Sequence, residues 1–296
     1  MKYNKIIPVY KNMIPICSFI LSLFILTSPL FGNEIRKGAE FESLIRQLSK
    51  DGFDKRKLEQ LFSGKGIYFS PDRASLFFVH KESGLNYDQF LSKKDIKSAL
   101  KYLKDKKYIL DKAQKRFGVD RTIITAILLV ETRLGAYTGN SVVINTLATI
   151  ASLSDKALRE RIWDSIPNKR KPSRAAFIKK VQRRYKWAYS ELKAFLKYIE
   201  EEGLKPESIK GSYAGAMGLA QFMPSNIRKL ARDGNNDGRI DLFNHADAIF
   251  SVANYLKYHG WRPALTRQRQ HKILYMYNHS NYYVDTLLKI SDKLKE

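Results

Sequence analysis

The sequence predicts a mainly α-helical protein, on three observations. Apolar residues recur at helical spacing along most of the 296-residue chain. Side chains that commonly cap helices precede several of these apolar runs. The alternation of strand-like and helix-like segments that builds a parallel sheet is absent from the sequence. We therefore expect helices to carry the core and any functional site.

The first predicted helices lie in the N-terminal third of the chain. One apolar run with helical spacing stops at Gly52, and Asp54 is placed to cap the helix that follows. Residues 63–84 are punctuated by Gly, Pro and Ser and predict a loop with at most a short strand. Ser92, with Asp95 three residues later, matches a capping box before the next helix. Helical patterns dominate from there to the C-terminus.

The first 32 residues have the pattern of an export segment. Three lysines precede a long apolar run that carries no charge before Glu34, as in a secretory signal peptide. An uncleaved membrane anchor is the alternative, because the neutral run approaches the length of a membrane span. The single cysteine, Cys17, lies within this run, so a cleaved chain has no disulfide. We expect an exported protein of the periplasm or cell envelope, with membrane contact only through residues 1–32 if they are retained.

The chain is strongly basic. It has 53 Lys and Arg against 29 Asp and Glu, a formal net charge of +24. Such a charge indicates anionic partners, and export argues against nucleic acid as one of them. Residues 152–190 stand out, because acids are absent from Ser165 to Ser190 while basic and aromatic residues alternate there. This stretch is either a solvated helical face with its aromatic side on the core, or a surface for an anionic polymer.

Glu131 is the candidate catalytic residue. Asp120 is placed to cap a helix whose residues 123–130 are apolar except for one threonine, so we expect the helix to be buried. Glu131 stands at its C-terminal end, where apolar surroundings and the negative end of the helix dipole both disfavour a charged carboxylate. A carboxyl group that stays protonated near neutral pH is suited to general acid catalysis. The alternative is a structural ion pair with Arg133 or another basic group.

Five motifs, in this order, resemble the lytic murein transglycosylase B family, glycoside hydrolase family 103. They are VETRLG (130–135), NTLATIA (145–151), GSYAGAMGLAQFMPS (211–225), DGNNDGRIDLFNHADAIFSVANYLKYHGW (233–261) and YNHSNYY (277–283). The resemblance implies a lysozyme-like catalytic core at 110–296, an accessory helical segment at 33–109 and no organic cofactor. It also assigns Glu131 as the single catalytic carboxylate. Positions that line the family's sugar groove correspond here to Ser212, Gln221, Tyr255, Tyr277, Asn278 and Tyr283.

The activity that this resemblance implies is cleavage of peptidoglycan glycan between N-acetylmuramic acid and N-acetylglucosamine. Glu131 would act as acid and then as base, while the sugar's own C6 hydroxyl closes a 1,6-anhydro ring. Ordinary glycosidases use two carboxylates, and no second acid lies close to Glu131 within these motifs. A hydrolytic muramidase on the same fold and a catalytically silent wall-binding protein are the alternatives. Peptidoglycan strands are the expected partner, with cell-wall synthesis or division proteins as further candidates.

Residues 233–247 begin like an EF-hand calcium loop. Asp233, Asn235 and Asp237 occupy positions 1, 3 and 5, and Arg239 at position 7 offers its backbone carbonyl. Position 12 is an asparagine where an EF-hand has a bidentate glutamate. The resemblance implies a longer loop that closes on Asp247 and a Ca²⁺ of structural role. A metal-free turn stabilised by Asn and Asp side chains is the alternative.

The segment 211–225 combines three glycines with many apolar residues and ends in Pro-Ser. We expect its apolar members to pack inward. We expect its glycines to let a sugar chain pass close to the backbone near Glu131.

Overall fold

The computed structural model describes residues 38–79 and 86–296. The predicted signal or anchor and Cys17 lie outside the described residues. Residues Lys37–Glu296 belong to a single compact unit. Within the described ranges, no helix is both long and apolar enough to cross a membrane. The prediction of a mainly α-helical fold is confirmed, since only two short strands, β1 (Ser141–Val142) and β2 (Lys210–Gly211), occur in those ranges.

The first helices confirm one prediction and correct another. They are α1 (Glu42–Lys50), α2 (Lys55–Ser63) and α3 (Pro71–Val79), after a short 3₁₀ turn at Ala39–Phe41. Asp54 caps α2 as expected, because its carboxylate accepts the Lys57 backbone N–H at 2.9 Å. The loop predicted at 63–84 is wrong for α3, where proline opens the helix and Phe77 and Phe78 are buried.

The next group of helices leads to Glu131. It comprises a 3₁₀ turn (Tyr87–Leu91), α4 (Lys93–Asp105), α5 (Lys107–Phe117) and α6 (Arg121–Thr132). Ser92 caps α4 through the Asp95 N–H, as predicted. Asp120 occupies the cap position of α6, but its side chain makes no capping hydrogen bond. The Gln114 side chain accepts the first N–H of α6, from Arg121, in its place.

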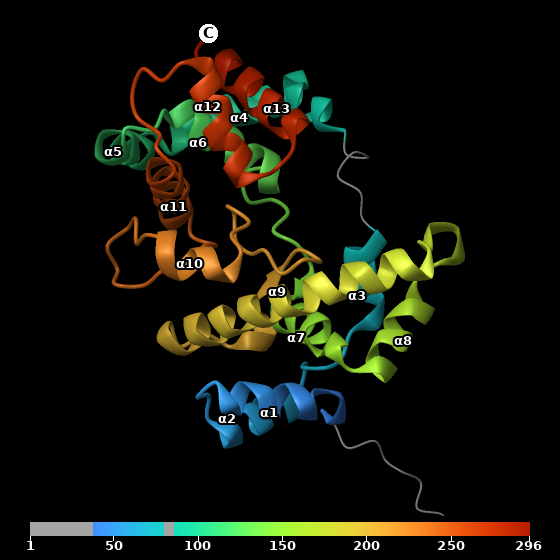
Figure 1. Ribbon diagram of the computed structural model, residues 1–296. Coiled ribbons are helices and arrows are strands. Elements are labelled where there is room, and N and C mark those ends of the chain that lie inside the picture. The colour runs from blue at the N-terminus through green and yellow to red at the C-terminus, as the bar shows by residue number, and fades with distance from the viewer. Residues whose placement is uncertain (1–37, 80–85) are drawn as a thin grey trace, which may run out of the picture. The chain divides into compact units, whose positions relative to one another are not determined.

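The middle of the chain forms a second helical group. It contains α7 (Val143–Ala151), α8 (Lys156–Ser165) and the long α9 (Arg174–Glu201), with 3₁₀ turns at Ser152–Ser154, Asn168–Arg170 and Pro206–Ser208. Every residue of α7 is buried, and α9 packs along it (Figure 1). The basic stretch noted at residues 152–190, expected to be an insertion in the catalytic core, therefore comprises the 3₁₀ turn at 152–154, α8, the 3₁₀ turn at 168–170 and the first half of α9. Its aromatic residues Phe177 and Tyr189 are buried in the core, while most of its cations are exposed.

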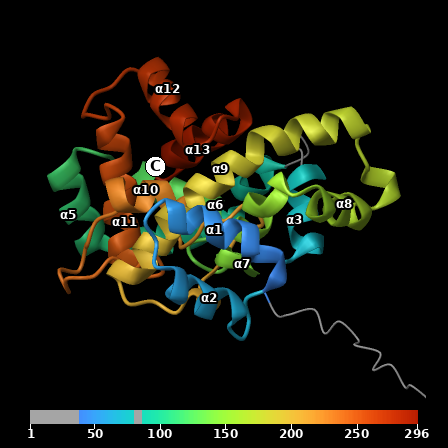
Figure 2. The ribbon, with the colours of Figure 1, turned by 60° about the horizontal axis from the view of Figure 1, so that its bottom comes forward.

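Two of the four C-terminal helices pack on α6. They are α10 (Pro224–Leu230), α11 (His245–Tyr258), α12 (Arg267–Tyr277) and α13 (Asn281–Lys293). Figures 1 and 2 show α13 beside α12, and contacts join α13 to α6 and α11 to α5. The domain boundary expected between residues 109 and 110 falls inside α5. Because α4 also packs on α6, the helices before that boundary share the packing of the catalytic segment.

Candidate functional site

Glu131 is one of two residues of α6 that are not buried. The other is Arg121 at the start of the helix, and the remaining ten residues of α6 are buried. The helix ends directly after Glu131, where Arg133 and Leu134 take left-handed backbone angles (φ 49° and 60°). The Leu134 N–H bonds back to the Leu128 carbonyl at 2.9 Å, which fixes this turn. Glu131 therefore stands at the rigid C-terminal end of a buried helix, as the sequence predicts.

The ion pair offered as an alternative for Glu131 is not formed by Arg133. The Arg133 guanidinium donates to Asp95 at 2.6 Å and to Gln89 at 2.8 Å, and it lies over the Phe90 ring. These contacts point the cation toward α4 and the preceding 3₁₀ turn. They also hold the end of α6 in place.

A buried tyrosine binds Glu131 directly. Tyr283, on α13, is 1% exposed and donates its hydroxyl to Oε1 of Glu131 at 2.6 Å. Its ring meets the Tyr87 ring edge to face, with centroids 5.9 Å apart. Burial, and then the charge of Glu131, raise the pKa of Tyr283 well above its usual value. The phenol therefore keeps its proton and acts as a donor to the carboxylate.

Two further tyrosines continue this cluster. Tyr277 ends α12 and donates to the Ala220 carbonyl at 2.6 Å, and its pKa is raised first by burial and then by the charge of Glu131. Tyr255 is 6% exposed, donates to the Met276 carbonyl at 2.7 Å and stacks edge-on against Tyr277. Burial raises the pKa of Tyr255 to about 12.

This burial revises the role expected of the tyrosines. The resemblance placed Tyr255, Tyr277 and Tyr283 along a sugar groove, yet the rings of Tyr255 and Tyr283 pack on the protein. Tyr283 instead contacts the candidate catalytic group, and Tyr255 supports Tyr277. Asn278, the remaining residue of this motif predicted to bind sugar, is half-buried where α12 ends.

The segment 211–225 is joined to α6 and to the chain that follows it. The Thr132 hydroxyl donates to the Leu219 carbonyl at 2.9 Å. The Gln221 amide nitrogen donates to the carbonyls of Thr138 (3.1 Å) and Gly218 (2.9 Å), so Oε1 of Gln221 has no donor in the described part of the chain. Ser212 accepts two backbone N–H groups of its own turn, from Ala214 and Ala216.

Thr132 and Tyr87 are contributors that the sequence did not single out. Thr132 adjoins Glu131 in the VETRLG motif, so its position was the available signal. Tyr87 lies in a short 3₁₀ turn with no pattern that marks it. Both act on the site through residues distant in sequence, Leu219 and Tyr283.

The glycines of segment 211–225 serve a packing role that the sequence did not indicate. A Cβ at Gly218 would lie 2.4 Å from Cβ of Leu242, and one at Gly211 would lie 2.1 Å from the Ala216 carbonyl oxygen. These glycines therefore allow the segment to pack against the protein itself, and the expected close approach of a sugar stays a prediction. The apolar members Met217, Leu219 and Phe222 are buried, as predicted.

The predicted calcium loop is held by bonds to its own backbone. Asp233 accepts the N–H groups of Asn236 (2.6 Å) and Gly238 (2.8 Å), and Asp237 accepts that of Arg239 at 2.9 Å. The Asn235 amide donates to Asp237 at 2.8 Å.

The last predicted ligand, Asp247, is 1% exposed and closes the loop. It accepts the N–H groups of Gly234 and Asp241, both at 2.8 Å. Burial is the largest of the effects that raise its pKa. In the described ranges, no three His, Cys, Asp or Glu side chains converge as a metal cluster. The atoms that the loop offers as metal ligands are nevertheless all oxygens, which a hard cation such as Ca²⁺ prefers.

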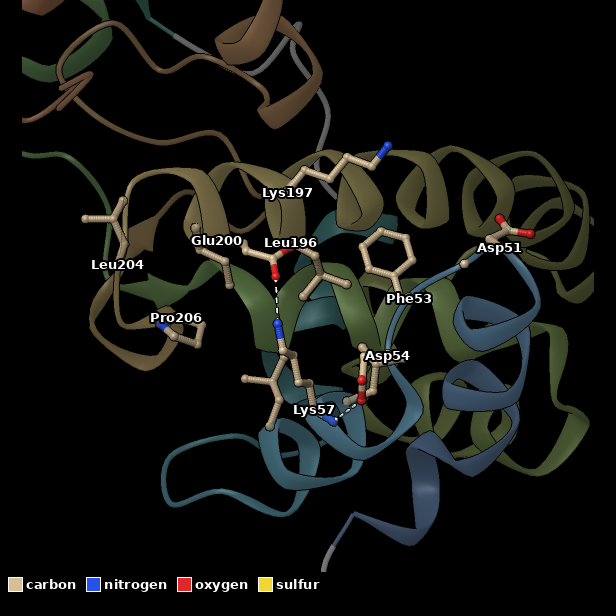
Figure 3. Close-up of a pocket in the computed structure, with 13 residues that line it drawn as sticks. Asp51, Phe53, Asp54, Lys57, Leu196, Lys197, Glu200, Leu204 and Pro206 are labelled. Carbon is tan, nitrogen blue, oxygen red and sulfur yellow. Dashed lines mark hydrogen bonds and ion pairs between the residues drawn. The ribbon is translucent and has the colours of Figure 1, made fainter. Parts of the chain in front are cut away.

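A separate pocket lies between α2 and the C-terminal part of α9. Its volume is about 630 Å³, and none of the predicted site residues lines it. Figure 3 shows Lys57 bridging the pocket to Glu200 at 3.0 Å, with Phe53 and Leu196 among its apolar walls. Both charged partners are largely exposed, so this pair adds little stability.

Comparison with known proteins gives consistent matches. The model of the family described as "Transglycosylase SLT domain" matches residues 37–272. Membrane-bound lytic murein transglycosylase B of Escherichia coli K12 is 30% identical over 227 residues, which is 73% of this chain. The match covers 55% of that relative, so the chain spans about half of the relative's length.

Two solved structures are similar in fold. The E. coli lytic transglycosylase Slt35 in complex with calcium has a TM-score of 0.66 at 22% identity, covering 86% of this chain and 92% of that one. SltB3 of Pseudomonas aeruginosa in complex with NAG-anhNAM-pentapeptide has a TM-score of 0.68 at 20% identity, covering 88% and 80%. These matches confirm the lysozyme-like fold expected from the motifs.

Proposed function

The chain belongs to the transglycosylase SLT domain family, and on this premise we propose that it is a peptidoglycan lytic transglycosylase. The observation that carries the proposal is the pairing of Glu131 with Tyr283. A single carboxyl group at the end of a buried helix receives a 2.6 Å hydrogen bond from a phenol that keeps its proton. This is a site built to stabilise one carboxylate as it forms.

Glu131 acts first as the acid. Its proton passes to the glycosidic oxygen as the bond to the muramyl C1 breaks, and a carboxylate forms. The Tyr283 hydroxyl strengthens its bond to Oε1 as this negative charge develops, so the bond favours the transition state over the ground state. The muramyl N-acetyl group stabilises the positive charge at C1.

Glu131 then acts as the base. Its carboxylate takes the proton of the C6 hydroxyl of the same muramyl residue, and the C6 oxygen bonds to C1. The product carries a 1,6-anhydro ring, and Glu131 is protonated again for the next cycle. In the competing muramidase reaction, water takes the place of the C6 hydroxyl. The anhydro sugar in the ligand of the similar SltB3 structure supports the first of these reactions.

We assign the substrate contacts to polar groups of segment 211–225 and of the end of α12. Gln221 offers Oε1 as an acceptor. The Ser212 oxygen accepts two N–H groups, so the hydrogen-bonding capacity that its hydroxyl keeps for a sugar is its own proton. Tyr277 and Asn278 complete the set at the end of α12. The envelope location implied by the names of the relatives fits this substrate, and we propose that the chain is exported to reach it.

We further propose that Asp233, Asn235, Asp237, Asp247 and the Arg239 carbonyl hold a structural Ca²⁺. The calcium in the similar Slt35 structure supports this assignment. The ion would fix the loop that precedes α11. Adding Ca²⁺ should raise the melting temperature, since a ligand at 100 times its dissociation constant stabilises by about 2.7 kcal/mol. A D237N variant should lose this response, and no response in the parent protein would exclude the site.

The experiment that tests the function is mass spectrometry of digested sacculi. The parent protein should release muropeptides with anhydro ends, and E131Q should release none while its melting temperature stays close to that of the parent. E202Q is the matched control, because Glu202 is a half-buried carboxylate that accepts the Ile240 N–H away from the site. Reducing-end products would identify a muramidase instead, and absence of products from the parent would identify a silent wall-binding protein.

A further inference from the structure

One part of the surface carries more positive charge than the nearby carboxylates compensate. Between residues 165 and 190 there are nine Lys and Arg and no acid. Four of these cations are engaged by the protein: Lys171 lies over Trp163, Arg174 pairs with Glu160, Lys180 donates to the Phe78 carbonyl and Arg184 lies over Phe77. Five others are exposed and form no ion pair within the described residues. We call these five the basic surface: Lys169, Arg170, Lys179, Arg183 and Lys186.

The helix spacing gathers this charge on one side. Lys179, Arg183 and Lys186 are four and then three residues apart on α9, so they share a face and span about 10 Å along the axis. Lys169 and Arg170 lie on the 3₁₀ turn just before the N-terminus of the same helix. Figure 1 shows this end of α9 beside α8.

Aromatic side chains accompany the cations. Trp163 and Trp187 are half-buried, with one part of each ring against the core residues Phe177 and Phe77. A mixture of Lys, Arg and partly exposed Trp is typical of surfaces that meet a lipid headgroup layer.

The lysine-rich region of α4 and α5 provides a contrast. There the Lys101 and Lys107 ammonium groups pair with Asp105 and Asp111, each four residues further on. These carboxylates partly compensate the positive charge. The positive charge is therefore less compensated on the basic surface than on α4 and α5.

The start of the described chain lies next to this region. Glu40 pairs with Arg161 of α8 at 3.1 Å. The predicted apolar run ends at residue 32, and the eight residues from there to Glu40 can extend over about 30 Å at most. An uncleaved anchor would therefore keep Glu40, which pairs with α8, within about 30 Å of the residue at which the anchor ends.

We propose that the basic surface binds the headgroups of anionic phospholipids and holds the protein at a membrane face. Each cation near such a surface contributes about a fivefold increase in the partition coefficient. The attraction falls with ionic strength, because salt screens charges over about 8 Å at 0.15 M. This role is separate from catalysis, since none of the five residues belongs to the site around Glu131.

The test compares the full chain on two kinds of vesicle, pure phosphatidylcholine and phosphatidylcholine mixed with phosphatidylglycerol. An apolar segment raises both partition coefficients to the same extent, so the ratio of the two coefficients isolates the contribution of charge. Neutralising Lys169, Lys179, Arg183 and Lys186 to glutamine should lower this ratio about 100-fold or more at low salt. The matched control neutralises four exposed lysines of α4 that form no ion pair in the described residues: Lys93, Lys94, Lys97 and Lys104.

The control variant should keep most of the preference for anionic vesicles. Equal loss in both variants would show that total charge, and not this surface, governs binding, and would overturn the proposal. An unchanged ratio in the first variant would overturn it as well. Loss of sacculus binding with an unchanged vesicle ratio would assign the surface to a wall polymer. Turnover of soluble glycan strands should be unaffected, and a loss there would assign the surface to the substrate groove.

Discussion

Replacing Tyr283 with phenylalanine removes one hydroxyl group and leaves the buried ring in place. The parent hydroxyl donates to Oε1 of Glu131 at 2.6 Å, and the residue is 1% exposed. The ring keeps its packing against Tyr87 because the volume of the side chain barely changes. The substitution therefore tests the hydrogen bond itself.

The expected loss follows from the charge of the acceptor. A hydrogen bond to a charged group contributes about 1.5–3 kcal/mol. Y283F should lose this full contribution to transition-state stabilisation, because the carboxylate forms in the transition state. At 1.36 kcal/mol for each factor of ten, kcat/KM should fall about 10- to 100-fold.

The substitution should also move the pH profile in a known direction. The Tyr283 hydroxyl donates to the ionised form of Glu131, so its removal should disfavour ionisation of that carboxyl group. The free enzyme needs Glu131 protonated to act as an acid, so activity declines where rising pH ionises this group. In Y283F the decline should therefore occur at a higher pH than in the parent, while the maximum is lower.

The assay is the pH dependence of kcat/KM for release of anhydro products from soluble glycan strands. Y255F is the matched control, because it removes a buried hydroxyl that donates to the Met276 carbonyl and not to Glu131. It should lower the melting temperature and leave the alkaline limb of the profile where it is. A parent-like profile in Y283F, or an equal shift of the alkaline limb in Y255F, would refute this role of the Tyr283 hydroxyl.

Two further predictions concern segment 211–225 and the bond that joins it to α6. In G218A the new Cβ would lie 2.4 Å from Leu242 at a φ of 73°, so chemical denaturation should show that the unfolding free energy falls by several kcal/mol. In the control G52A, where φ is 92° and the space is open, it should fall by only about 1–2 kcal/mol. Similar losses in the two variants would refute the packing role of Gly218. T132V keeps its shape but leaves the buried Leu219 carbonyl without its 2.9 Å donor, and it should cost about 1–3 kcal/mol of unfolding free energy; an unchanged denaturation midpoint would show that this bond does not secure the segment.

The features that the sequence predicts correctly depend on neighbours along the chain. The spacing of apolar residues identifies most helices, and the caps at Asp54 and Ser92 form because each side chain reaches an N–H three residues ahead. Glu131 could be assigned to the end of a buried helix for the same reason. Such interactions are short in sequence, so a local pattern contains them.

Local patterns failed where a distant residue supplies the energy. Helix α3 forms in a stretch of Gly, Pro and Ser because Phe77 and Phe78 pack on Trp187 and Phe177, about a hundred residues away. Asp120 has the sequence position of a cap, yet the Gln114 side chain accepts the Arg121 N–H.

By itself, the sequence determined the helical class and, through its motifs, the family and the candidate acid. Only the tertiary structure decided what surrounds that acid. Tyr283 lies 152 positions beyond Glu131 and reaches it because α13 packs on α6. A side chain at Gly218 would clash with Leu242, which lies 24 positions further along the chain. Contacts of this kind depend on how helices pack, and sequence spacing carries no record of the distances that packing creates.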